Sequence, residues 1–129
     1  MIAGRVLVSG EAVVTVVVRG PGGRTARVEA MVDTGFNEQL TLPPWVVERL
    51  GLTFEEEAYY TLADGARSGT RVFRGEIEWH GTWREIMIVE IESDALLGMG
   101  AMCGCNLNID VMHGGHVEIR PLAVEGIRD

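Results

Sequence analysis

The sequence has little positive charge: 11 arginine and lysine residues stand against 19 aspartate and glutamate residues, which gives a formal net charge of −8. Nucleic acids and anionic membranes both bind basic surfaces, so this balance argues against either as the main partner. A neutral or cationic peptide remains compatible with the charge.

Long hydrophobic runs are also absent. The longest apolar stretch, residues 12–18, is interrupted by Thr15 and is far too short to span a bilayer. The first ten residues have neither the apolar core nor the small-residue cleavage site of a secretory signal. We therefore expect a cytoplasmic location.

Cysteine is scarce, with Cys103 and Cys105 separated by one glycine. A disulfide between such close neighbours is strained in most backbones, so two thiols in a reducing compartment are expected. With His113 and His116 the cysteines form a C-x-C…H-x-x-H pattern, but known zinc sites place more residues between paired cysteines. We expect no metal and no cofactor, and keep a zinc-dependent structural module as a third hypothesis.

The chain is rich instead in short β-forming segments separated by turn residues. Strands are predicted at residues 6–8, 12–18, 25–32, 39–42, 58–63, 67–79, 83–91, 106–111 and 116–119. One helix is predicted after Pro43, since Val46, Val47 and Leu50 have helical spacing and Gly51 is a natural stop. Residues 55–57, three glutamates, are predicted to be a solvated loop. This pattern indicates a mainly β, closed or folded-over single domain over residues 1–129.

The triplet Asp33-Thr34-Gly35 follows the alternating segment 25–32, in which Val28, Ala30 and Val32 share one face. Alone it is weak evidence of function, because a given tripeptide of common residues occurs by chance in roughly a few per cent of chains this size. Its position between two predicted strands is more informative. Asp33 would sit at a turn held by sheet on both sides, with Gly35 permitting close backbone approach.

A second motif, Leu96-Leu97-Gly98, follows much later in the chain. With residues 31–35, Met-Val-Asp-Thr-Gly, it resembles the retropepsin-like aspartic proteases, especially bacterial members, in which a Phe often follows the triplet as Phe36 does here. The resemblance implies a mainly β acid-protease barrel with one short helix, forming half of a two-fold dimer. It also implies a flap that closes over substrate, for which residues 61–66 are well placed, with Ala63, Asp64 and Gly65 at the turn.

The resemblance further implies that Asp33 is the catalytic carboxylate and Leu96, Leu97 and Gly98 the supporting late motif. Two facing carboxylates share one proton, so that one activates water and the other acts as an acid. The chain has one Asp-Thr-Gly, so the second carboxylate is expected from another copy in a homodimer. By resemblance, Thr34 would bond across the dimer axis, and Gly35 would donate a backbone N–H to the carboxylate.

Two departures from the family pattern bear on function. Viral and pepsin-like members usually have a small Ala or Ser after the triplet, whereas Phe36 is bulky beside the expected cleft. Met99 stands where many viral members have a polar or charged residue. The first hypothesis is therefore an aspartic endopeptidase that hydrolyses a peptide or protein substrate without a cofactor. The alternative, which Phe36 and Met99 favour, is a catalytically silent dimerisation or peptide-binding module that binds an extended peptide by strand addition.

Overall fold

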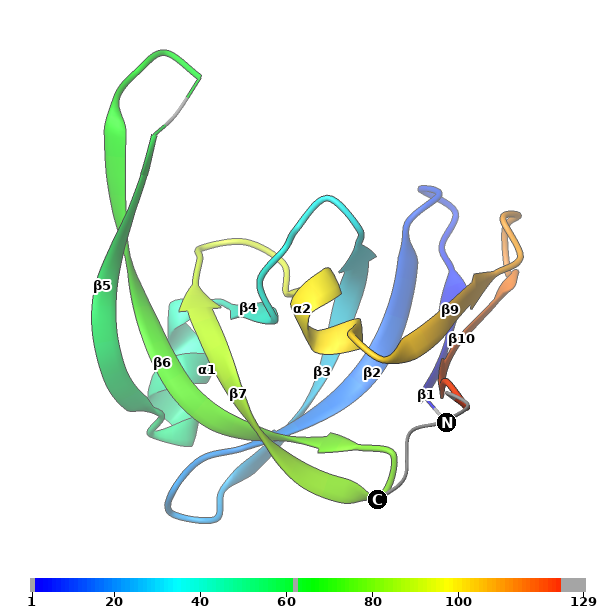
Figure 1. Ribbon diagram of the computed structural model, residues 1–129, viewed down its shortest axis with the longest axis horizontal. Helices are drawn as coiled ribbons and strands as arrows, with labels where there is room; N and C mark the ends of the chain where they lie inside the picture. The colour runs from blue at the N-terminus through cyan, green and yellow to red at the C-terminus, as the bar shows by residue number, and fades with distance from the viewer. Residues whose placement is uncertain (1, 62, 124–129) are drawn as a thin grey trace.

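The computed structural model describes residues 2–61 and 63–123, which form a mainly β structure with two short helices (Figure 1). The helices are α1 (Pro44–Leu50) and α2 (Met99–Met102). The strands are β1 (Ile2–Val6), β2 (Ala12–Arg19), β3 (Thr25–Asp33), β4 (Leu40–Leu42), β5 (Thr53–Thr61), β6 (Arg67–Trp79), β7 (Thr82–Glu90), β8 (Leu96–Gly98), β9 (Cys105–Ile109) and β10 (His116–Pro121).

The strands form one sheet in the order β5-β6-β7-β4-β8-β3-β2-β1-β10-β9. An additional antiparallel pairing between β6 and β2, at Val18 with Ile77 and Arg19 with Glu76, closes the six strands from β6 to β2 into a barrel. Closure leaves β5 and the group β1-β10-β9 outside the barrel, at opposite ends of the strand order. The retropepsin-like, mainly β fold predicted from the sequence is therefore observed.

The barrel interior is filled by alternating side chains, as expected where one face of each strand is buried. In β6, Phe73, Ile77 and Trp79 are buried together with Gly75, at alternate positions along the strand. The only polar residue among the fully buried side chains of the described residues is Thr41, in the middle of β4. Its Oγ1 accepts a hydrogen bond from the Leu96 backbone N–H at 2.8 Å and so ties β4 to β8.

The helix α1 has the ends that the sequence predicted. Pro43 is the N-cap residue, and Pro44 occupies the first helical position, where its missing N–H leaves nothing unpaired. Gly51 ends the helix in the left-handed conformation, with φ 61°, and donates its N–H to Glu48. Val46, Val47 and Leu50 face the core.

Two predicted segments are wrong and one helix was missed. The first strand is Ile2–Val6 rather than residues 6–8, because Leu7 begins a turn in which the Gly10 N–H donates to the Leu7 carbonyl. Residues 55–57 belong to β5 and are exposed; Glu56 and Glu57 pair with β6, and Glu55 lies at a register shift of that pairing. The helix α2, with only four residues, was not predicted. Of the predicted flap, Leu62 lies outside the described residues.

Candidate active site

Asp33 is the last residue of β3, and β3 runs parallel to β8. The register pairs Met31 with Leu96, Val32 with Leu97, and Asp33 with Gly98. The two motifs that the sequence singled out are therefore hydrogen-bonded neighbours, although they lie far apart in the chain. The β3–β4 loop that follows Asp33, residues 34–39, rises on the upper side of the molecule in Figure 1.

The backbone of this loop holds the Asp33 carboxylate in place. The Gly35 N–H donates to Asp33 Oδ1 at 2.9 Å, and the Phe36 N–H donates to the Asp33 carbonyl at 3.2 Å. Asp33 is half-buried, whereas Thr34 and Gly35 are exposed. Within the described residues no side chain bonds to the Asp33 carboxylate or to the Thr34 hydroxyl. One carboxylate oxygen is thus fixed by the backbone, and the other is left for water, substrate or a second carboxylate.

The segment from Gly98 to Gly100 braces the loop from below. The N–H groups of Gly98, Met99 and Gly100 donate to the carbonyls of Gln39, Phe36 and Glu38 at 2.9, 2.8 and 3.1 Å. Three consecutive backbone donors therefore meet the loop where the family pattern led us to expect a polar side chain. Met99 takes part through its backbone, while its side chain is 47 % exposed.

Gly98 is required by space rather than by backbone conformation. A Cβ built on it would lie 2.5 Å from Phe36 Cδ2 and 2.7 Å from the Phe36 carbonyl oxygen, and closer still to the Glu38 carbonyl oxygen. Its φ of −98° is accessible to any residue. The Phe36 side chain and the loop backbone therefore pack directly on the glycine. The sequence did not predict this contact, since nothing in a linear pattern relates residue 36 to residue 98.

The predicted flap residues Ala63, Asp64 and Gly65 form the exposed turn between β5 and β6. The turn is stabilised by an Asp64 Oδ1 that accepts the Ala66 N–H at 2.9 Å, and Gly65 has a φ of 87°. The β5–β6 hairpin extends away from the barrel, to the same upper side of Figure 1 as the β3–β4 loop.

The surface of the described residues has several hollows, with volumes from ≈ 290 to ≈ 560 Å³, and one of them adjoins the β3–β4 loop. We call this one the loop–flap hollow; its volume is ≈ 510 Å³. Phe36 and Glu38 line it from the loop, Glu56 from β5, and Val72 and Val89 from β6 and β7. The hollow therefore lies between the Asp33 loop and the β5–β6 hairpin, which the sequence predicted to be a flap.

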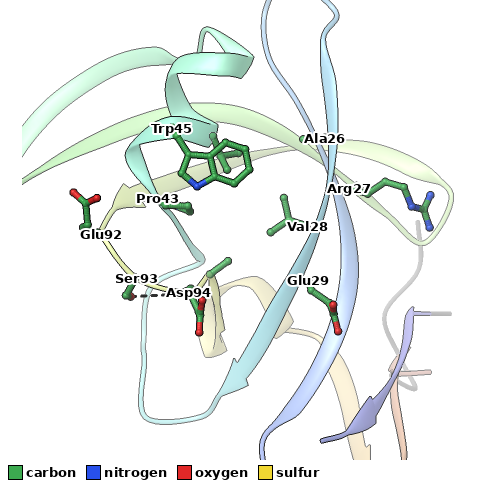
Figure 2. A pocket seen from close by; sticks show the side chains of 11 residues that line it. Ala26, Arg27, Val28, Glu29, Pro43, Trp45, Glu92, Ser93 and Asp94 are labelled. Carbon is green, nitrogen blue, oxygen red and sulfur yellow. Dashed lines mark hydrogen bonds between the residues drawn. The ribbon is translucent and has the colours of Figure 1, made fainter.

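Another hollow, shown in Figure 2, has a volume of ≈ 470 Å³ and lies beside the first half of β3. Trp45, which is 65 % exposed, lines it from α1, and Glu92 and Asp94 line it from the segment between β7 and β8. Neither Asp33 nor the β3–β4 loop lines this hollow. Of the two, the loop–flap hollow is thus the one that adjoins the Asp33 loop.

The residues of the zinc-like pattern do not come together. Cys105 lies beside His80, with Sγ 3.6 Å from Nε2, rather than beside His113 or His116. His116 instead contacts Glu118 at 3.2 Å. Over residues 2–61 and 63–123 no group of three or more His, Cys, Asp or Glu side chains is arranged to hold a metal ion. In the same part of the chain no helix has the length and apolarity needed to cross a membrane.

A closed β barrel that carries Asp-Thr-Gly at a strand end, braced by a glycine of a parallel neighbour, defines the aspartic-protease class. In agreement, a protein-family model described as aspartyl protease matches residues 14–101, which include both motifs and the β5–β6 hairpin. The chain belongs to this aspartyl protease family. No curated protein and no solved structure matched the chain.

Proposed function

We propose that this chain is an aspartic endopeptidase, a single retropepsin-like domain over residues 1–129 that acts in the cytoplasm as a homodimer. The observation that carries the proposal is the Asp33 carboxylate, which one backbone N–H holds at 2.9 Å and which stands at the exposed end of β3. The loop that holds it lines a hollow large enough for a peptide side chain. Family membership supports peptide-bond hydrolysis as the chemistry.

The mechanism requires a second carboxylate, and no other Asp of the sequence is followed by Thr-Gly. In a two-fold dimer the partner's Asp33 would face this one, and the like charges would hold a single proton between them. The ionised carboxylate removes a proton from water, which attacks the scissile carbonyl, while the protonated carboxyl donates to the carbonyl oxygen. The tetrahedral species then collapses, the C–N bond breaks, and the proton taken from water passes to the leaving amine. Thr34 is exposed at the start of the β3–β4 loop, and we expect it to contact the partner's loop.

The alternative is a catalytically silent member that dimerises or binds peptide. Phe36 favours it, because this bulky side chain lines the hollow beside Asp33 and reduces the room for a scissile bond. Against it stands the intact Asp-Thr-Gly with its Gly35 hydrogen bond. In both cases the hollow between the loop and the flap holds the bound peptide.

The decisive experiment measures cleavage of a diverse peptide mixture from about pH 3 to about pH 8, the range in which a shared-proton carboxylate pair loses activity. Wild type is compared with Asp33→Asn and with Asp110→Asn, a matched change at an exposed Asp of the β9–β10 turn. Cleavage that is lost only in Asp33→Asn, while thermal stability and dimer mass persist, supports the endopeptidase. A rate that rises through pH 8, or a protein that stays monomeric with peptide inhibitor present, contradicts the shared-carboxylate mechanism.

A further inference from the structure

The loop–flap hollow combines an apolar floor with two acidic groups. Phe36, Val72 and Val89 supply apolar lining, and Val72 is nearly fully buried. Glu38 of the β3–β4 loop and Glu56 of β5 line the same hollow from two different elements, and both are exposed. Apolar walls with a few polar groups at the rim are typical of sites that bind a side chain and fix its orientation.

The glutamates of β5 and β7 and of the β3–β4 loop differ in whether their carboxylates have a partner. Three neighbouring glutamates have partners: Glu55 pairs with Arg74 at 3.1 Å, Glu90 with Arg71 at 2.7 Å, and Glu57 accepts from the Tyr59 hydroxyl at 2.9 Å. Within the described residues, the carboxylates of Glu38 and Glu56 have neither an ion pair nor a side-chain hydrogen bond.

No arginine is among the residues that line the hollow, within the part of the chain that the structure describes. Arg71 and Arg74 pair with the glutamates on their own side of the sheet. Arg67 lies over the ring of Tyr59, with its guanidinium carbon 5.1 Å from the ring centre. Since the chain as a whole carries a net charge of −8, no general excess of positive charge compensates the two free carboxylates.

We propose that the loop–flap hollow selects an arginine or lysine side chain of the peptide substrate. The aliphatic stem lies against Phe36, Val72 and Val89, and the cationic head reaches Glu38 and Glu56 at the rim. Both contributions are needed, because an exposed ion pair alone is weak whereas apolar walls reduce the screening by water. This inference rests on the proposed function, since it names the substrate class of the same site.

The test compares peptides that carry arginine or citrulline in turn at each position flanking the cut. Citrulline has nearly the same shape but no charge, so the ratio of kcat/KM for the two peptides isolates the charge. We expect wild type to prefer arginine at one position by about tenfold, equivalent to about 1.4 kcal/mol. The ratio should fall to about one in the double variant Glu38→Gln, Glu56→Gln. Because it is a ratio, a general loss of activity in the variant cancels.

The control is Glu48→Gln, which makes the same charge change on the exposed face of α1, away from the hollow. The arginine preference should persist in this variant. Equal cleavage of arginine and citrulline peptides by wild type, or a preference that survives the double substitution, overturns the proposal. The single variants Glu38→Gln and Glu56→Gln cover the case in which the double variant fails to fold.

Binding measurements distinguish failure of the protease proposal from failure of the selectivity proposal. In the Asp33→Asn variant, the fluorescence anisotropy of labelled arginine and citrulline peptides measures their binding to the hollow without requiring cleavage. Tighter binding of the arginine peptide by about tenfold, with no cleavage by wild type, would retain the selectivity and refute the endopeptidase. Cleavage by wild type together with equal binding of the two peptides would refute the selectivity alone.

Discussion

The close packing of Gly98 under the β3–β4 loop makes Gly98→Ala the most informative single substitution. The added methyl group would lie 2.5 Å from Phe36 Cδ2 and 2.7 Å from the Phe36 carbonyl oxygen, and would also meet the Glu38 carbonyl. The ring of Phe36 can rotate, but the two carbonyl oxygens belong to the backbone that positions Asp33. The loop must therefore move, and the three N–H bonds from Gly98, Met99 and Gly100 are weakened with it.

Overpacking of this kind costs about 1–3 kcal/mol, and we expect about 3 kcal/mol because backbone rather than a side chain must shift. For a domain of this size that corresponds to a decrease in Tm on the order of 10 °C. The matched control is Gly22→Ala, since a Cβ there meets nothing within 4 Å and its φ is ordinary. This control should change the free energy of unfolding by about 0.5 kcal/mol or less.

The assay is urea unfolding followed by tryptophan fluorescence, with the m-value checked to confirm that both variants unfold as wild type does. Peptide cleavage is measured on the fraction that remains folded. We expect Gly98→Ala to lose cleavage even where it is fully folded, because the Asp33 loop is displaced. A stability equal to that of Gly22→Ala, with unchanged cleavage, would refute the packing argument.

Two further substitutions test the framework of the site. In Thr41→Val the Leu96 N–H loses its only side-chain acceptor in a buried position, so stability should fall by about 1–3 kcal/mol, while Thr41→Ser should largely preserve it in urea unfolding. Burial, together with the nearby Arg84 guanidinium, lowers the pKa of His80 below its ordinary value of 6.5. Its Nδ1 is buried and has no hydrogen-bond partner among the described residues. The unfolded chain therefore binds a proton first, so the stabilisation is complete above pH 6.5 and is lost as the pH falls through the folded-state pKa. Thermal melts of His80→Asn, whose side chain suits the φ of 51° at this turn, should show a smaller decrease in Tm between neutral and acidic pH than wild type. An equal decrease in both proteins would argue against His80 as the source, and His113→Asn at the exposed turn is the control.

Local patterns predicted most of the fold, because they depend on neighbouring residues. The alternation in β3, the Asp64-Gly65 turn and the Pro43 and Gly51 ends of α1 are each determined within a few residues. The glutamates at 55–57 were misassigned because low β-propensity is overridden by pairing with β6, which lies later in the chain. The first strand was misplaced because Leu7 begins a turn and because β1 pairs with β10, at the other end of the described chain.

The candidate site was predicted in its parts but not in its assembly. The triplet and the late motif were recognised as patterns, whereas their parallel register, Asp33 opposite Gly98, is visible only in the folded sheet. The contact of Phe36 with Gly98 and the hollow that Glu38 and Glu56 share are long-range packing features of the same kind. Thr41 offered a weak signal, as a polar residue between two leucines that proved to be fully buried.

The pairing of β3 with β8 also determines when, during synthesis, the Asp33 loop acquires its geometry. Until β8 and the N–H donors of residues 98–100 have emerged from the ribosome, a nascent chain carries the Asp-Thr-Gly triplet without the segment that braces it. Contacts between residues so distant in sequence form late, since the chain entropy of closing the intervening loop must be overcome first. An incomplete chain therefore carries the Asp-Thr-Gly triplet before the loop that holds Asp33 has folded, and this loop forms only when almost the whole barrel can fold.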